Sequence, residues 1–146
     1  MTLLENTSFY KEAFNEILFP FGTFYLFDTF IVSEIKEGIV MNWEDHGKIV
    51  AEEICHLYDT NGANIVYLSN RIYPYALKPT DWIKYFRLGY KLKGYGIINS
   101  NKTAYPNGLL EKLFIPSKVK RFHSLENAIH WARSLSAMKM SISQEL

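Results

Sequence analysis

The order of the segments along the chain constrains its fold more than any other feature of the sequence. A hairpin-like stretch, rich in aromatic and β-branched residues, occupies residues 24–41. Three further strand-like stretches follow it, and a helix-like stretch separates each from the next. The last unit, residues 118–133, is a short strand that runs directly into a capped amphipathic helix. Strands that alternate with helices in this way are typical of an α/β domain with a mixed sheet.

Length and composition predict one globular domain that binds no nucleic acid. The 146 residues are enough for one core and too few for two ordinary ones, and 48% of them are hydrophobic. A net charge of +1, with scattered lysines and arginines, differs from the basic surface of a nucleic-acid-binding protein. The most apolar stretch, residues 19–32, is interrupted by Pro20, Gly22 and Asp28, which predicts no stable membrane insertion.

The expected compartment follows from the N-terminus and the cysteine content. The first residues lack the basic and apolar regions of a signal peptide. A single cysteine, Cys55, rules out an internal disulfide and fits a reducing environment. We therefore expect a cytoplasmic protein.

The pattern divides the chain into a domain and two flanking segments. We expect residues 22–136 to form the domain, with an N-terminal extension at 1–21 and a frayed tail at 137–146. Residues 8–19 fit either a helix or an edge strand. Their apolar side chains recur at helical spacing, while residues 19–22 have the composition of a turn.

Local signals place the predicted helices and strands. Asn42, with Asp45 three residues later, is a good N-cap for the first helix, and Ser124 caps the last. The other predicted elements are a hairpin closed by a turn at 36–38, a central buried strand at 64–69, a helix from Pro79 or Thr80, strands at 94–99 and 119–123, and a helix at 103–114 with Leu110, Leu113 and Phe114 inward. This predicts a mixed, mostly parallel sheet of about five strands flanked by about four helices.

Three stretches carry a resemblance to a known family. They are Glu37-Gly38 ahead of the first helix, the central strand at 64–69, and Arg121-Phe122 followed by Glu, Ala and Trp on the final helix at 124–131. In this order they resemble the bacterial SpoIIAA-like family, which has the STAS/SEC14-type fold, over residues 22–135. The resemblance implies a regulatory, protein-binding module, and its SEC14-like side implies binding of lipids or other apolar molecules. Members that antagonise anti-sigma factors carry a phosphoacceptor serine in an Asp-Ser-Ser-Gly-type loop. Here Ser69 stands at the matching place without that motif.

The loop after the central strand is the best candidate site. Ligands of open α/β sheets bind outside the carboxyl ends of the strands. Serine, asparagine and arginine at that place suit an anion or the carboxylate of a partner, and two tyrosines follow them. The alternative is that these side chains only cap the strand and the next turn. The candidate binding residues are Ser69, Asn70, Arg71, Tyr73 and Tyr75.

Other reactive side chains do not form a catalytic or metal-binding pattern. The four histidines lack the spacing of a zinc site. Cys55 and His56 are adjacent on a predicted helix, so their side chains point about 100° apart. The chain contains no glycine-rich phosphate loop. We expect no cofactor, no metal and no enzymatic activity.

Two hypotheses for function follow. The first is a non-enzymatic regulatory or protein-binding module with an unknown partner. The second is a binder of a small apolar ligand or lipid in an aromatic-lined cleft of some hundreds of Å3. The aromatic content is also compatible with a homodimer. The rings expected to line the cleft are Phe24, Tyr67, Tyr73, Trp82 and Tyr95.

Overall fold

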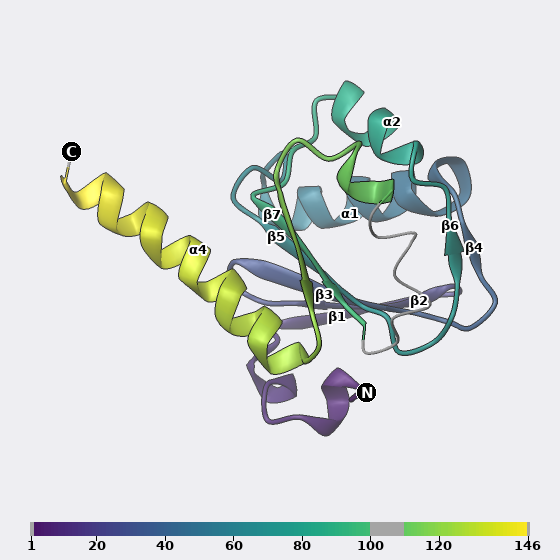
Figure 1. The fold of residues 1–146 in the computed structure, drawn as a ribbon, viewed down its shortest axis with the longest axis horizontal. Helices are drawn as coiled ribbons and strands as arrows, with labels where there is room; N and C mark the ends of the chain where they lie inside the picture. Colours follow the sequence, from purple (N-terminus) through teal and green to yellow (C-terminus); the bar gives the residue numbers. More distant parts are fainter. Residues whose placement is uncertain (1, 100–109, 146) are drawn as a thin grey trace.

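The first half of the sheet is an antiparallel meander. The protein is described by a computed structural model that covers residues 2–99 and 110–145 (Figure 1). Strand β1 (Asn15–Phe19) pairs with β2 (Gly22–Leu26), and β2 pairs with β3 (Phe30–Ile35). A tight turn at Pro20 joins β1 to β2, because proline presets the backbone angle that such a turn needs. Residues 8–19 therefore contain the edge strand, preceded by a short 3-10 turn, Tyr10–Glu12.

The predicted hairpin at 24–41 is wrong in its turn and in its second strand. The chain reverses at Asp28, where the Phe27 N–H donates to the Phe30 carbonyl at 2.9 Å. Gly38 does adopt a positive φ of 77°, but the chain leaves the sheet there. The short strand that follows, β4 (Val40–Met41), pairs in parallel with β6 (Ala76–Leu77) in a separate two-stranded sheet. The apolar run at 23–35 is longer than an ordinary strand, and it holds two strands with aspartate between them.

The second half of the sheet is parallel. Strands β5 (Val66–Asn70), β7 (Gly94–Ile98) and β8 (Lys118–Phe122) follow β3, which gives the order β1-β2-β3-β5-β7-β8. Three of the five pairings in this sheet are parallel. The predicted α/β class with a mixed sheet is confirmed, with six strands in place of about five.

Helices cover both faces of the sheet (Figure 1). Helix α1 (Lys48–Tyr58), which follows a π-helical turn at Trp43–Gly47, lies on one face together with α2 (Asp81–Arg87). Helix α4 (Leu125–Glu145) lies on the other face beside the N-terminal 3-10 turns. Both predicted caps are confirmed. The Asn42 side chain accepts the Asp45 N–H at 2.8 Å, and the Ser124 hydroxyl accepts the Asn127 N–H at 3.2 Å.

Helix α4 is longer than the sequence pattern predicted. It continues to Glu145 and projects away from the sheet (Figure 1), where a frayed tail was expected from residue 137. The segment contains neither glycine nor proline, so nothing in it ends a helix. In the part of the chain that the structure describes, no helix is both long and apolar enough to cross a bilayer. The helix predicted at 103–114 lies largely outside the described residues, although residues 110–112 are helical.

Two apolar layers hold these elements together. Alternate residues of the strands point to opposite faces, so each face has its own core. On the α4 face, Leu4 of the N-terminal segment is fully buried among residues of the strands and of α4. On the α1 face, Ile54 packs against residues of β2 and β3. Aromatic side chains of α2 extend this second core toward β7.

Candidate functional site

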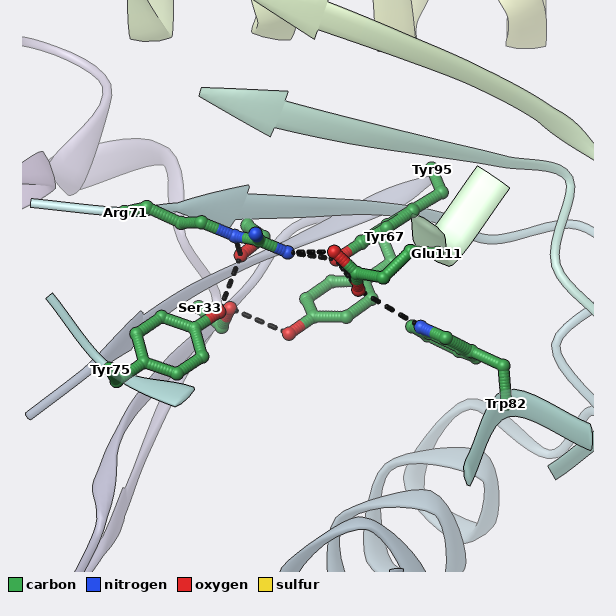
Figure 2. A network of polar contacts seen from close by, with 8 residues as sticks. Ser33, Tyr67, Arg71, Tyr75, Trp82, Tyr95 and Glu111 are labelled. Carbon is green, nitrogen blue, oxygen red and sulfur yellow. Dashed lines mark hydrogen bonds and ion pairs between the residues drawn. The ribbon is translucent and has the colours of Figure 1, made fainter. Parts of the chain in front are cut away.

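Three of the five predicted loop residues meet on the α1 face of the sheet. The Arg71 Nε–H donates to the Ser69 hydroxyl at 3.2 Å, and that hydroxyl shares a hydrogen bond of 3.0 Å with the Tyr75 hydroxyl. The Arg71 guanidinium carbon also lies 5.6 Å from the centre of the Tyr75 ring. Figure 2 labels Arg71 and Tyr75 of this group, which both belong to the segment after β5.

The other two predicted residues are elsewhere. Asn70 belongs to the opposite face, because neighbouring residues of a strand alternate. Its amide donates to the Glu34 carboxylate at 2.8 Å and to the Thr2 carbonyl at 3.1 Å. Tyr73 is 43% exposed at the surface. The predicted set of five is therefore divided between two faces and the surface.

Arg71 binds a carboxylate of its own chain, and the sequence analysis did not include that residue. Glu111 is completely buried and forms an ion pair with Arg71. Its other oxygen accepts the Tyr95 hydroxyl at 2.7 Å and the Trp82 indole N–H at 3.0 Å. These four side chains come from the loop after β5, from the segment after residue 109, from β7 and from α2. Glu111 therefore links elements that are distant in sequence (Figure 2).

The orientation predicted for the segment around Glu111 is wrong. Leu110 and Leu113 were expected to point inward, but they are 49% and 74% exposed. The buried residue between them is the glutamate, because the Arg71 guanidinium on the facing loop provides a charge partner inside the protein. The sequence contains one signal for this contact, an arginine directly after a buried strand. If such an arginine is itself buried, it needs an acidic partner.

The electrostatics of the pair keep Arg71 charged. Burial by itself would lower the pKa of Arg71, but the Tyr75 and Tyr95 hydroxyls and the Glu111 carboxylate raise it well above its ordinary value. Its side chain is only 8% exposed. The guanidinium that was predicted to hold an external anion is thus occupied by an internal one.

A cavity of about 150 Å3 lies beside this network, between the sheet, α1 and α2. Its wall is mostly apolar and includes Phe24, Tyr67, Trp82 and Tyr95, which are four of the five rings expected to line a cleft. The fifth, Tyr73, is at the surface. The volume is smaller than the predicted hundreds of Å3, because these rings contact one another. The ring centres of Tyr67 and Tyr95, for example, are 5.2 Å apart.

Several polar groups in the cavity wall have partners within the protein or are disfavoured as ions. The Tyr67 hydroxyl shares a hydrogen bond of 2.7 Å with the Ser33 hydroxyl. Burial raises the pKa of Tyr67 and of Tyr95, so both phenols stay neutral. Burial also raises the pKa of Cys55, which disfavours the thiolate that a nucleophile would need. The site is a mostly apolar, ring-lined space beside the buried ion pair, and its wall also includes the charged residues Lys78 and Asp81.

The histidines do not converge on a metal site in the described residues. No group of three or more His, Cys, Asp or Glu side chains has a suitable arrangement in residues 2–99 and 110–145. His46 has a structural contact, since its Nδ1 accepts the Asn42 N–H at 3.0 Å. Its ring also meets the Phe21 ring edge to face, with the centres 4.7 Å apart.

The chain is similar in structure to a known protein. No family model matches the chain, and no curated protein matches it. Among solved structures it is similar to a crystal structure described as an uncharacterized protein from the DUF3478 family with a SpoIIAA-like fold, from Shewanella loihica PV-4. The two are 18% identical, the match covers 72% of this chain and 84% of that one, and the TM-score is 0.49. The neighbour has the fold that the sequence resembles. The α/β class of this chain stands on its own strand order and pairings.

Proposed function

We propose that the protein is a non-enzymatic binding module that holds a small, compact and largely apolar molecule in the cavity between the sheet, α1 and α2. The apolar wall of that cavity is the observation that supports the proposal most strongly. An apolar guest in this space would remove part of the apolar wall from water, which favours its binding. Aromatic side chains give such a guest a large contact area at a small cost in conformational entropy.

The volume limits the size of the guest. Sites for drug-sized ligands usually enclose about 300–1,000 Å3, and a lipid chain needs a long groove. A cavity of about 150 Å3 suits a single small ring or a short branched chain. The proposal is therefore narrower than the lipid-binding hypothesis that the SEC14-like resemblance implied.

Binding is a better match to this wall than catalysis. Glu111 accepts hydrogen bonds at both oxygens, and Arg71 is engaged with it. The thiol of Cys55 is held in its neutral form by burial. A general acid or base must be able to exchange a proton with a substrate, whereas Arg71 and Glu111 are paired with one another.

A protein partner stays a prediction. The loop that we expected to meet a partner turns Ser69, Arg71 and Tyr75 inward, and Tyr73 is the exposed side chain among the five candidates. A partner that recognises this loop would thus meet a different surface from the one that the sequence suggested.

Titration with benzene tests the proposal. Benzene should bind saturably, and the amide resonances that shift in a two-dimensional NMR spectrum should belong to residues of the cavity wall. Ala51 lies in that wall, so Ala51→Met should fill the space and weaken binding by at least about tenfold, with a melting temperature equal to or above that of the wild type.

The matched control is Leu88→Met, a change at a side chain that is 63% exposed, and it should leave binding unchanged. Benzene that causes no saturable shifts in the cavity, or that binds Ala51→Met as well as the wild type, would contradict the proposal.

A further inference from the structure

The two edges of the main sheet carry different charges. Strand β8, at one edge, has Lys118, Lys120 and Arg121 among its five residues. Strand β1, at the other edge, has Glu16 as its single charged residue. Lysines on an edge strand discourage pairing with another chain, because addition of a strand would bury their charge. The β1 edge lacks this protection.

The hydrogen-bond pattern identifies which groups β1 turns outward. The Phe27 N–H bonds to the Phe30 carbonyl, and the Lys36 N–H bonds to the Phe21 carbonyl. Odd-numbered residues of β2 thus bond to β3, so its even-numbered residues bond to β1, because the two sides alternate. The partners of those even-numbered residues in β1 are Asn15, Ile17 and Phe19. The N–H and C=O groups of the two remaining residues, Glu16 and Leu18, point away from the sheet.

Apolar surface accompanies this edge. Leu18 is 74% exposed and lies on the α4 face, opposite Thr23 of β2. Phe14, directly before the strand, is 57% exposed. An edge with outward backbone groups, one charge and exposed apolar side chains is a template for strand addition.

We propose that β1 pairs antiparallel with β1 of a second copy of this chain, about a twofold axis at Ile17. In this register Glu16 of each copy lies opposite Leu18 of the other. All outward N–H and C=O groups of these residues are then used in four inter-chain hydrogen bonds. No like charges face each other. Centring the pair on Leu18 would place Glu16 opposite Pro20, which has no N–H to donate.

Symmetry favours a second copy with the same edge over a pairing of β1 with β8. Pairing β1 with β8 would be heterologous and would extend without limit, whereas pairing β1 with itself closes as a dimer with one continuous sheet. The Asn15 side chain opposes association to a limited extent, since its Oδ1 accepts the outward Glu16 N–H at 2.8 Å. This contact is at the surface and must open when the strands pair.

Sedimentation velocity from micromolar to near-millimolar concentration tests the dimer, and charge exchange tests its register. In Leu18→Glu, the new glutamate of each copy lies opposite Glu16 of the other copy. This repulsion should raise the dissociation constant of the dimer by at least about tenfold. The double variant Glu16→Lys with Leu18→Glu replaces each repulsion by an attraction and should restore the dimer. The matched control is Val40→Glu, at a side chain that is 68% exposed on β4.

Circular dichroism shows whether each variant is folded. A wild type that stays monomeric, or forms open-ended oligomers, would overturn the proposal. So would a dimer that Leu18→Glu leaves intact, or one that the double variant does not recover, because both results place the interface or its register elsewhere. The proposal would be supported if Val40→Glu keeps the dimer, Leu18→Glu loses it, and the double variant recovers it.

Discussion

The ion pair between Arg71 and Glu111 makes a quantitative prediction about stability. Both side chains are buried, with exposed fractions of 8% and 1%. Removal of one charge from a buried pair leaves the other uncompensated, which costs about 3–5 kcal/mol. We therefore expect Arg71→Met, and separately Glu111→Gln, to lower the free energy of unfolding by that amount. A loss of this size is a large fraction of the roughly 5–15 kcal/mol that stabilises a domain.

The double variant should be much more stable than the sum of the single effects implies. With Arg71→Met and Glu111→Gln together, no buried charge is left unpaired. The glutamine oxygen still accepts the Trp82 and Tyr95 hydrogen bonds, and the buried amide NH2 group, which takes the place of the oxygen that faced Arg71, is left unsatisfied at a cost of about 1–3 kcal/mol. Two independent losses would total about 6–10 kcal/mol, so the double variant should recover at least about 3 kcal/mol of that sum.

Urea unfolding followed by tryptophan fluorescence and far-UV circular dichroism measures all four proteins of this cycle. Glu44→Gln is the control, because Glu44 pairs with Lys84 at the surface, where solvent screens the interaction, and its removal should change little. Single variants at Arg71 and Glu111 that behave like this surface control would refute the reasoning. Strict additivity in the double variant would refute it as well.

Further predictions concern one buried carboxylate, one helix cap and one glycine. Burial raises the pKa of Glu34 above its ordinary 4.5, so the stability of the wild type relative to Glu34→Gln should increase as pH falls from neutrality toward 4.5. A stability difference in urea unfolding that does not change with pH would contradict this. Asn42→Ala should cost about 1 kcal/mol in urea unfolding, since it removes the N-cap hydrogen bond; no loss would show that the cap is dispensable. Gly62→Ala should lower the melting temperature much more than Gly38→Ala does. Both glycines have a positive φ, but only at Gly62 would the new methyl group meet a backbone oxygen, that of Lys91. Equal decreases in melting temperature for the two variants would contradict this.

The sequence predicted the elements that depend on local signals. The caps at Asn42 and Ser124 and the turn at Pro20 depend on residues within one or two turns of chain, so their chemistry is visible in the sequence. The compact apolar runs of β5 and β7 were also visible, because buried parallel strands are apolar on both faces.

The errors in the fold arose where local pattern does not determine pairing. Every residue of β3, and all but one of β2, is buried, so the run at 23–35 shows too little alternation to reveal the break at Asp28. The glycine turn at Gly38 was visible in the sequence. The partner of β4, however, is a strand some 36 residues later in the chain, and no local signal identifies that pairing.

The candidate site was predicted only in part, because local sequence pattern identifies its strand-end residues but not their distant partner. Arg71 and Tyr75 follow a central strand, and the carboxyl end of such a strand is a known place for functional side chains. Glu111 could not be recognised, because it lies 40 residues after Arg71 in a helical segment between two exposed leucines. The alternation that turns Asn70 to the opposite face was predictable from the strand itself.

A crystal structure determined under xenon pressure tests the central claim most directly, because xenon occupies dry apolar cavities and scatters X-rays strongly. We predict a xenon atom between the sheet, α1 and α2, in contact with residues such as Tyr67, Trp82 and Tyr95, and no xenon there in Ala51→Met crystals. Ordered water in that space, or xenon sites that avoid it in the wild type, would contradict an apolar ligand-binding cavity.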